Sequence, residues 1–367
     1  MLYALLSLLI ALCSIPLPDA DAAQVELAWG PSSGSATGYL VHYGSSSGIY
    51  DYHVDVGNYT ACTISGLQEG ETYYFAASAY NAVEESNLSE ELVYTIPTNP
   101  AIESSNSLPM EFDEVQIDNN WKRINFSQSF ADPIVVANPL SINGTDPAVI
   151  RIRNVGSKGF EIRVQEWNYL DGTHGVENVS YLAMERGSFT LGNGARIEAG
   201  RFSMDKTNTF GRVSFKQSFT KVPVVVTAIT SFNESDTVTG RVKNVDTRGF
   251  EYTMQEQESF SDGHTGESVA YIAWEPSAGT VDGITYEIGK TGKDVSHSFH
   301  TIQFKTDFKN PPVFFADMQT ANNMDTANVR WQNKDAYAVE VQIDEEQSKD
   351  VEIKHTTEVV GCMAFSY

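Results

Sequence analysis

Short apolar runs that suit β-strands follow one another along most of the chain. Leu27 and Trp29 alternate with polar neighbours near the start, and the segment 38–44 (GYLVHYG) alternates in the same way. Later runs follow a proline, as at 134–136 and 224–226. Alternation with a period of two is typical of strands, and no stretch shows the 3.6-residue period of an amphipathic helix. The pattern therefore predicts an all-β protein.

One block of this pattern occurs three times. Phe126, Phe215 and Phe304 each open an F-x-x-x-F segment that leads into a proline and an apolar strand. The blocks recur about 90 residues apart, which is longer than the 20–50 residues of solenoid repeats. A period of this length is the size of a small globular domain. The chain therefore carries three copies of one domain, and the third copy is the most degenerate.

Each copy contains about six predicted strands. Two packed sheets of three strands are the natural closure for so few strands. We place the copies at 109–187, 195–276 and 284–367, and we interpret the Gly/Ser/Thr-rich segments 187–195 and 276–285 as joints between them.

The segment that precedes the copies has a sandwich pattern of its own. Leu67 is followed by a turn at Gly70 and then by Tyr73, which is the spacing of a tyrosine corner. With the early Trp29 and the strand 38–44, this segment resembles a fibronectin type III domain. The resemblance implies a spacer or interaction module over residues 24–98. The polar residues 98–108 are interpreted as a linker.

Charge and the N-terminal residues indicate where the protein acts. The formal net charge is −24, which argues against binding to nucleic acid or to anionic lipid. Residues 1–23 resemble a secretion signal, with an apolar run from Leu2 to Leu12 that is too short to span a bilayer and a small-x-small site at 20–22. We therefore expect a secreted, extracellular protein without membrane insertion.

The repeats also resemble a known family of binding proteins. The motifs F-x-x-x-F-x-x-x-P-V-V-V and R-x-x-N-V-x-x-x-G-F, with a final apolar strand, are similar to those of the H-type lectin domain. The resemblance implies a six-stranded antiparallel β-sandwich that trimerises. It also implies binding of galactose or N-acetylgalactosamine without a metal or other cofactor.

The resemblance assigns sugar-binding positions residue by residue. The family has an Arg eight residues before the Gly of Gly-Phe, and a Trp-His pair that begins seven residues after that Phe. The first copy has Arg151 and Trp167 at these positions, with Asn168 in place of the His. The second and third copies keep only the arginine, as Arg241 and Arg330. The expected carbohydrate-binding residues are therefore Arg151, Trp167, Asn168, Arg241 and Arg330.

The same side chains have a purely structural interpretation. Trp167 could stack on the apolar face of a pyranose while Arg151 donates paired hydrogen bonds to its hydroxyls. Alternatively, Trp167 packs under a neighbouring domain and Arg151 pairs with a carboxylate such as Asp146 or Glu166. The sequence leaves both alternatives open.

A His-x-x-Glu motif ends each copy, beginning at His174, His264 and His355. Residues three apart on a strand face opposite sides of the sheet, so a shared metal ion is disfavoured and a structural hydrogen bond is favoured. No nucleophile–base pair or set of paired carboxylates recurs at positions that suggest a cleft. We therefore expect neither enzymatic activity nor a cofactor.

Two functions fit these features. The first is a secreted carbohydrate-binding protein that recognises galactose-type glycans or glycoproteins in cell adhesion or surface attachment, with tandem copies or a homotrimer supplying avidity. The second is a structural extracellular protein whose tandem sandwiches assemble into a filament or matrix.

Overall fold

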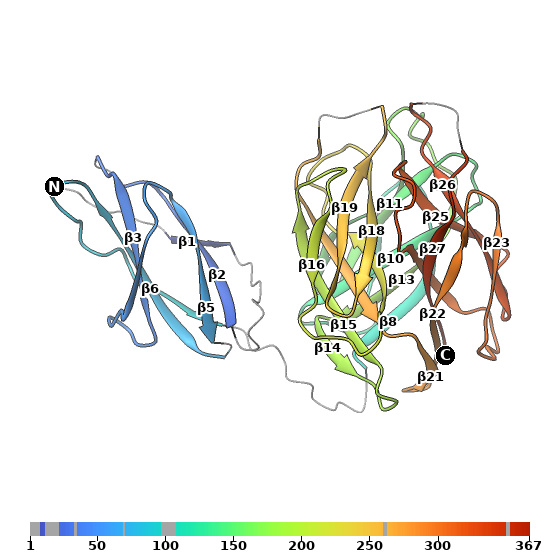
Figure 1. The fold of residues 1–367 in the computed structure, drawn as a ribbon, viewed down its shortest axis with the longest axis horizontal. Coiled ribbons are helices and arrows are strands. Elements are labelled where there is room, and N and C mark those ends of the chain that lie inside the picture. The colour runs from blue at the N-terminus through green and yellow to red at the C-terminus, as the bar shows by residue number, and fades with distance from the viewer. Residues whose placement is uncertain are drawn as a thin grey trace. The chain divides into compact units, whose positions relative to one another are not determined.

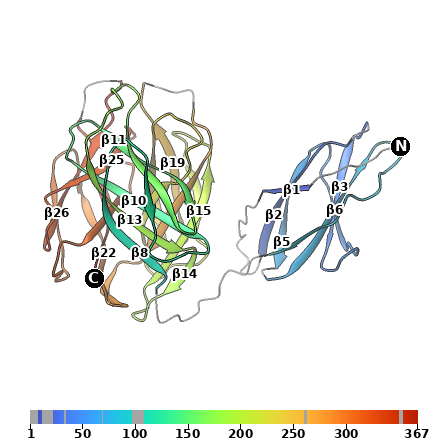
Figure 2. The same cartoon turned by 180° about the vertical axis from the view of Figure 1, so that it is seen from behind.

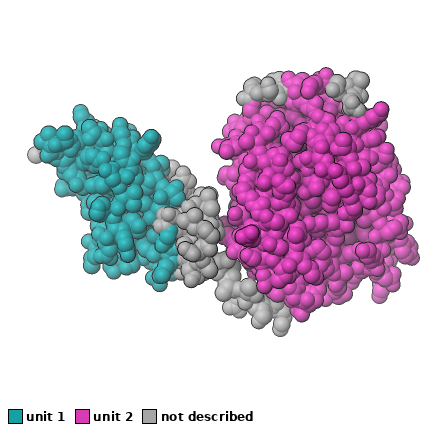
Figure 3. Space-filling view, in the orientation of Figure 1, with its two compact units in different colours: residues 1–101 teal, residues 102–367 magenta. Residues whose placement is uncertain are grey.

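The computed structural model divides the chain into two compact units, residues 1–101 and 102–367 (Figure 3). It describes residues 8–11, 22–32, 35–68, 70–96, 108–259, 263–349 and 353–367. Most of the predicted secretion signal and residues 98–107 of the predicted linker lie outside these ranges. In the part of the chain that the structure describes, no helix has the length and hydrophobicity needed to cross a membrane.

The first unit is a two-sheet sandwich. One sheet has the order β1-β2-β5 and the other β4-β3-β6-β7. Between them lies an apolar core that includes Trp29, Tyr39 and Phe75. The phenol of Tyr73 accepts a hydrogen bond of 3.1 Å from the backbone N–H of Gln68, which confirms the predicted tyrosine corner. The strands are β1 (Leu8–Ala11), β2 (Ala22–Trp29), β3 (Gly38–Gly44), β4 (Tyr52–Asp55), β5 (Ala61–Gln68), β6 (Thr72–Tyr80) and β7 (Leu92–Thr95).

The second unit contains the three repeats, and each forms the predicted six-stranded sandwich (Figures 1 and 2). In repeats 2 and 3 an additional hairpin strand, β14 (Gly187–Thr190) or β21 (Ser277–Val281), extends one of the two sheets. Repeat 1 has β8 (Met110–Ile117), β9 (Lys122–Asn125), β10 (Pro133–Ser141), β11 (Ala148–Gly156), β12 (Gly159–Glu166) and β13 (Glu177–Glu185). Repeat 2 has β15 (Arg196–Met204), β16 (Gly211–Ser214), β17 (Val224–Ile229), β18 (Val238–Asp246), β19 (Gly249–Glu256) and β20 (Glu267–Trp274). Repeat 3 has β22 (Ile284–Val295), β23 (His300–Gln303), β24 (Val313–Met318), β25 (Ala327–Gln332), β26 (Ala338–Glu345) and β27 (Glu358–Ser366).

The two sheets of a repeat have different surroundings. We call β8-β13-β10, β15-β20-β17 and β22-β27-β24 the inner sheets, because they face a core that all three repeats share. The remaining strands form the outer sheets, β9-β12-β11, β16-β19-β18 and β23-β26-β25. The contact between two adjacent repeats is called a seam.

The inner sheets are buried on both faces. Ile134 and Val136 of β10 point into the shared core, whereas Val135 and Ala137 point into the core of repeat 1 itself. In repeat 2, Val224 and Val226 likewise point into the shared core, whereas Val225 points into the core of repeat 2 itself. Strands that are covered on both faces read as continuous apolar runs, which explains the sequence pattern after each proline.

The shared core joins the three repeats into one unit. Trp274 of repeat 2 packs against Tyr286 and Phe365 of repeat 3, each at a ring-centroid distance of 5.4 Å. Phe112 of repeat 1 lies 5.5 Å from the ring of Phe365. Separating the repeats would expose these rings to water, so the tandem copies form a single closed structure.

The segments interpreted as joints are in fact ordered hairpins. β14 (Gly187–Thr190) pairs with β15, and β21 (Ser277–Val281) pairs with β22. Leu191 and Ala195 of the first hairpin contribute side chains to the shared core. The Gly/Ser/Thr composition reflects turn formation, and these segments are part of the core structure rather than simple connections.

The three seams are not identical. At the seam between repeats 3 and 1, β25 pairs in parallel with β10 through Leu140–Arg330 and Ser141–Trp331, so that one six-stranded sheet spans both repeats. At the seam between repeats 2 and 3, Asp317 accepts hydrogen bonds from the backbone N–H and the hydroxyl of Thr227. No inter-repeat strand pairing occurs at these other two seams among the described strands.

Replacement of Trp274 by alanine tests whether the shared core holds the repeats together. Loss of a fully buried tryptophan costs about 3–5 kcal/mol of unfolding free energy. Calorimetry of the full chain is expected to show a single thermal transition for all three repeats, at a lower temperature than without the substitution. The transition temperature of the first unit is expected to stay unchanged. The control is Tyr59→Ala, because Tyr59 is 76% exposed. Separate transitions for individual repeats would contradict the shared core.

Candidate functional site

The three arginines expected to bind sugar lie at the seams instead. Arg151, Arg241 and Arg330 are at most 1% exposed. Each reaches across a seam to the glutamate of a neighbouring repeat's His-x-x-Glu motif. The N–O distances are 3.3 Å for Arg151–Glu267, 2.7 Å for Arg241–Glu358 and 3.0 Å for Arg330–Glu177. The three pairs close a ring, from repeat 1 to 2, from 2 to 3, and from 3 back to 1.

A histidine and a second glutamate extend each pair. In repeat 1, His174 lies 3.2 Å from Glu166 through Nδ1 and 3.0 Å from Glu177 through Nε2. Repeats 2 and 3 show the same pattern around His264 and His355. The histidines lie in the loop before the last strand, so the His and Glu of one motif meet, unlike residues three apart within a strand.

The glutamate also organises the loop on its own repeat. Glu177 accepts hydrogen bonds from the backbone N–H of Asn143 and Gly144 and from the hydroxyl of Ser141. This is the structural role favoured for the motif. Among the described residues, no group of three or more His, Cys, Asp or Glu side chains is arranged to hold a metal ion.

The electrostatics of these clusters favour charged histidines. Burial alone would lower the pKa of His174, but its hydrogen bonds to Glu177 and Glu166 outweigh that effect and raise the pKa above its usual value. Burial likewise would raise the pKa of Glu177, whereas hydrogen bonds from His174 and Ser141 lower it. The corresponding groups of the other two repeats shift in the same directions. In each cluster the shifts therefore favour the charged forms of the histidine and of the glutamate that pairs with the arginine.

The tryptophan expected to stack on a sugar is buried. Trp167 is 1% exposed and Arg151 is fully buried, so no pyranose can stack on or reach them in this arrangement. Asn168 is exposed, but it donates a 2.8 Å hydrogen bond to Asp236 and accepts a 2.9 Å bond from Thr237 across the seam. The burial of Trp167 agrees with the packing alternative. Arg151 does pair with a carboxylate, but with Glu267 of the next repeat rather than with Asp146 or Glu166.

An open cleft lies at the seam between repeats 1 and 2. Its volume is about 450 Å³. Among the described residues that line it, none is acidic, although the chain has twice as many acidic as basic residues. The polar lining comes from Arg153, Asn154, Arg201, Thr230, Ser231, Asn233 and Ser268, and the aromatic lining from Phe232.

Arginines and aromatic rings stack at the edge of this cleft. The guanidinium of Arg153 lies 4.0 Å from the ring centroid of Trp121, and that of Arg163 lies 4.8 Å from it. Phe232 of repeat 2 meets Trp121 edge to face at 5.4 Å and lies 5.1 Å from the guanidinium of Arg163. We call Trp121, Arg153, Arg163 and Phe232 the seam cluster.

Both described arginines that line the cleft pair with carboxylates, whereas a third arginine beside it pairs with no described carboxylate. Glu161 accepts a 2.7 Å hydrogen bond from Arg153, and Asp132 pairs with Arg201. Arg163 has no carboxylate partner among the described residues, and its buried Nε has no hydrogen-bond acceptor. Burial, followed by the charge of Arg153, lowers the pKa of Arg163. Arg163 is not itself a lining residue of the cleft, but it lies beside Phe232, which is one.

One position of the seam cluster can be recognised in the sequence. Trp121 aligns with Phe210 and Phe299, so an aromatic residue occupies this position in every copy. Its partner Phe232 aligns with Ile142 and Ala321, so that position varies. The alignment alone did not show that Trp121 and Phe232, from different copies, lie in contact.

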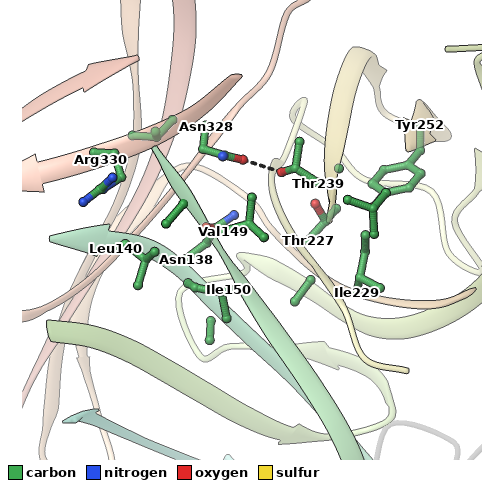
Figure 4. Close-up of a pocket in the computed structure, with 16 residues that line it drawn as sticks. Asn138, Leu140, Val149, Ile150, Thr227, Ile229, Thr239, Tyr252, Asn328 and Arg330 are labelled. Carbon is green, nitrogen blue, oxygen red and sulfur yellow. Dashed lines mark hydrogen bonds between the residues drawn. The ribbon is translucent and has the colours of Figure 1, made fainter. Parts of the chain in front are cut away.

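A second, smaller space lies where all three repeats meet. It has a volume of about 30 Å³ and is lined by residues of every repeat. Figure 4 shows Thr239 donating a hydrogen bond to Asn328 beside Val149 and Asn138. Space of this size suits a solvent molecule and excludes a sugar. The cleft between repeats 1 and 2 is therefore the better candidate for a binding site.

Comparisons with known proteins identify the first unit. A family model described as fibronectin type III domain matches residues 17–94. Residues 17–94 belong to the fibronectin type III family. A twitchin kinase region from C. elegans covers 50% of this chain and 30% of its own, at 19% identity and a TM-score of 0.19.

Two relatives match parts of the chain. A protein named halomucin, from Haloquadratum walsbyi, is 30% identical over 258 residues, which is 67% of this chain but 3% of the relative. A Kelch domain-containing protein from Saccharolobus solfataricus is 31% identical over 124 residues, which is 31% of this chain and 16% of the relative. The chain thus spans a small part of either relative. The H-type lectin resemblance of the repeats stays a prediction.

Removal of one seam arginine tests its structural role. Arg330→Ala removes the guanidinium that pairs with the buried carboxylate of Glu177 and leaves His174 as its remaining basic partner, so we expect a loss of about 3–5 kcal/mol in unfolding free energy. The double variant Arg330→Met, Glu177→Gln removes both charges and is expected to recover part of that loss. Urea denaturation measures both. An Arg330→Ala protein of unchanged stability would show that the seam pair is dispensable.

The pH dependence of stability follows from the same clusters. The histidines have raised pKa values, so their contribution is complete below pH about 6.5 and is lost as pH rises through the folded-state pKa. The paired glutamates have lowered pKa values, so their contribution is complete above pH about 4.5 and is lost in acid. Burial raises the pKa of Asp317 to about 7, which adds a loss of stability as pH rises towards 7.

We therefore expect the urea midpoint of the three-repeat unit to fall between pH 6 and pH 9. His355→Gln should flatten that fall, because it removes one of the three titrating imidazoles. His53→Gln, at an exposed position in the first unit, is the control. An equally steep fall in the His355→Gln variant would exclude that imidazole as a source.

Proposed function

We propose that this chain is an extracellular adhesion-type protein whose three-repeat unit binds carbohydrate in the cleft between repeats 1 and 2. The observation that carries the proposal is the cleft itself, which combines an aromatic ring, guanidinium, amide and hydroxyl groups in about 450 Å³. Sites for small ligands commonly have volumes of about 300–1,000 Å³ and a few convergent polar groups.

The chemistry of the lining suits a sugar. A pyranose offers an apolar C–H face, for which Phe232 supplies a ring, and a rim of hydroxyls. Asn154 and Asn233 can both donate to and accept from hydroxyls, while Arg153 donates in pairs. The resemblance to H-type lectins makes galactose or N-acetylgalactosamine glycans, free or on glycoproteins, the first ligands to test.

The extracellular setting has separate support. The fibronectin type III domain fits a spacer that carries the three-repeat unit, and the similarity to a protein named halomucin fits a surface role. The apolar N-terminal segment adds the expectation of secretion. We propose no enzymatic activity and no cofactor for this chain.

The alternative, a structural protein that assembles into a filament or matrix, requires surfaces other than the seams between repeats. Tandem sandwiches that assemble a filament would pack repeat against repeat along an open array. Here the repeats pack against one another within one chain and close a ring of Arg–Glu pairs. Assembly into a homotrimer or a filament would therefore have to use the outer surfaces of the unit, and electron microscopy would reveal it.

Substitution of Phe232 by alanine tests the proposed site. A glycan array with the full chain is expected to show binding to galactose-type glycans, and Phe232→Ala should reduce the affinity about tenfold or more, because a stacking ring is lost. Phe299→Ala, which removes an aromatic residue of repeat 3 that is 44% exposed, is the control and should bind normally. Equal binding by both variants would place the sugar elsewhere.

A further inference from the structure

We infer that the ligand of the cleft between repeats 1 and 2 is an acidic saccharide, a sugar that carries a carboxylate or a sulfate group. This inference rests on the proposed function and names the ligand class for the same site. Its basis is the arginines of the seam cluster, because a neutral sugar does not need positively charged partners.

The seam cluster brings two like charges together. Arg153 and Arg163 both stack on Trp121, at 4.0 and 4.8 Å from its ring centroid. Like charges held side by side repel each other and destabilise the fold. The rings of Trp121 and Phe232, and the carboxylate of Glu161 that pairs with Arg153, act against that repulsion. A bound anion would remove the repulsion.

Free donors remain at this point of the molecule. Arg153 is partly engaged by Glu161, but Arg163 donates to no described carboxylate, and its buried Nε lacks any acceptor. A guanidinium presents donors in a planar fork that matches a carboxylate or sulfate. The unfilled donors of the seam cluster therefore have the geometry for an oxyanion.

The surrounding charge makes this location selective. The chain carries a net charge of −24, which repels anions from most of its surface. The described lining of the cleft includes Arg153 and Arg201 and no acidic residue. An acidic group is therefore expected to bind here in preference to other parts of the surface.

The other two seams lack the pair of guanidiniums. By strand register, Arg163 corresponds to Thr253 in repeat 2 and to Gln342 in repeat 3. Arg153 corresponds to Lys243, which lies over Phe210 at 3.7 Å, and to Gln332. The cationic pair thus belongs to the first seam, and we expect one acidic-saccharide site in each chain.

The repeat unit therefore combines sugar recognition with charge recognition. Phe232, Asn154 and Asn233, which line the cleft, would contact the sugar. Its acidic substituent would lie by Arg153, which also lines the cleft, and Arg163, whose guanidinium is 5.1 Å from the ring of Phe232. Neither group of contacts alone distinguishes an acidic sugar from a neutral sugar or a simple anion. Together they do, since a ligand must satisfy both.

Calorimetric titration of the full chain separates these possibilities. The probes are galactose, galactose 6-sulfate, galacturonate and inorganic sulfate, each at low and high salt. We expect an acidic sugar to bind about tenfold or more tightly than galactose, because charge-assisted hydrogen bonds are stronger than neutral ones. Added salt should reduce this preference.

Variants assign the preference to the seam cluster. Arg163→Gln is expected to abolish most of the difference between galactose 6-sulfate and galactose. Lys243→Gln, at the position of repeat 2 that corresponds to Arg153, should keep it. Arg153→Gln is the second variant, to be used if Arg163→Gln fails to show the normal thermal transition of the three-repeat unit.

The outcomes distinguish this inference from the proposed function. Equal affinity for neutral and acidic sugars would overturn the inference and leave carbohydrate binding intact. Inorganic sulfate binding as tightly as galactose 6-sulfate would also overturn it, because the sugar ring would then contribute nothing. Absence of binding to every sugar, with the fold intact, would overturn the proposed function itself.

Discussion

The three-repeat unit depends on an arginine that crosses each seam to a buried glutamate. Isolated ions of either sign are very costly to bury, so each must be placed where its partner comes from another repeat. Arg151, Arg241 and Arg330 thus make the correct arrangement of all three repeats a condition for satisfying their charges. Separation of the repeats would leave each buried charge without this partner, so the pairs disfavour any other arrangement of the repeats.

Burial of apolar surface also holds the three repeats together. Every inner sheet has a second apolar face that its own sandwich cannot cover, and the shared core is formed only when the three repeats close around it. Burial of that surface drives association without specifying direction. The charged clusters then select the one arrangement in which each carboxylate has its cation. The three tandem copies therefore behave as one compact unit rather than as beads on a chain.

The three copies have diverged, so their seams differ from one another. A binding site can therefore form at one seam and be absent from the others. Parallel strand pairing joins repeats 3 and 1, and Asp317 with Thr227 ties repeats 2 and 3 together. The seam between repeats 1 and 2 keeps its arginine–glutamate pair but leaves a cleft beside it. A triplicated domain can in this way use the same framework at every seam and present a ligand site at one.

The sequence by itself determined the strand content, the threefold repetition, the six-stranded sandwiches and the tyrosine corner, because each depends on local periodicity or short spacing. It could not decide what Arg151 or Trp167 face, since the partner of each arginine lies in another copy, as Glu267 does for Arg151. The same limit hid the contact of Trp121 with Phe232. Only the tertiary structure decides which residues of different repeats meet, because closure around the shared core, and not sequence distance, places them side by side.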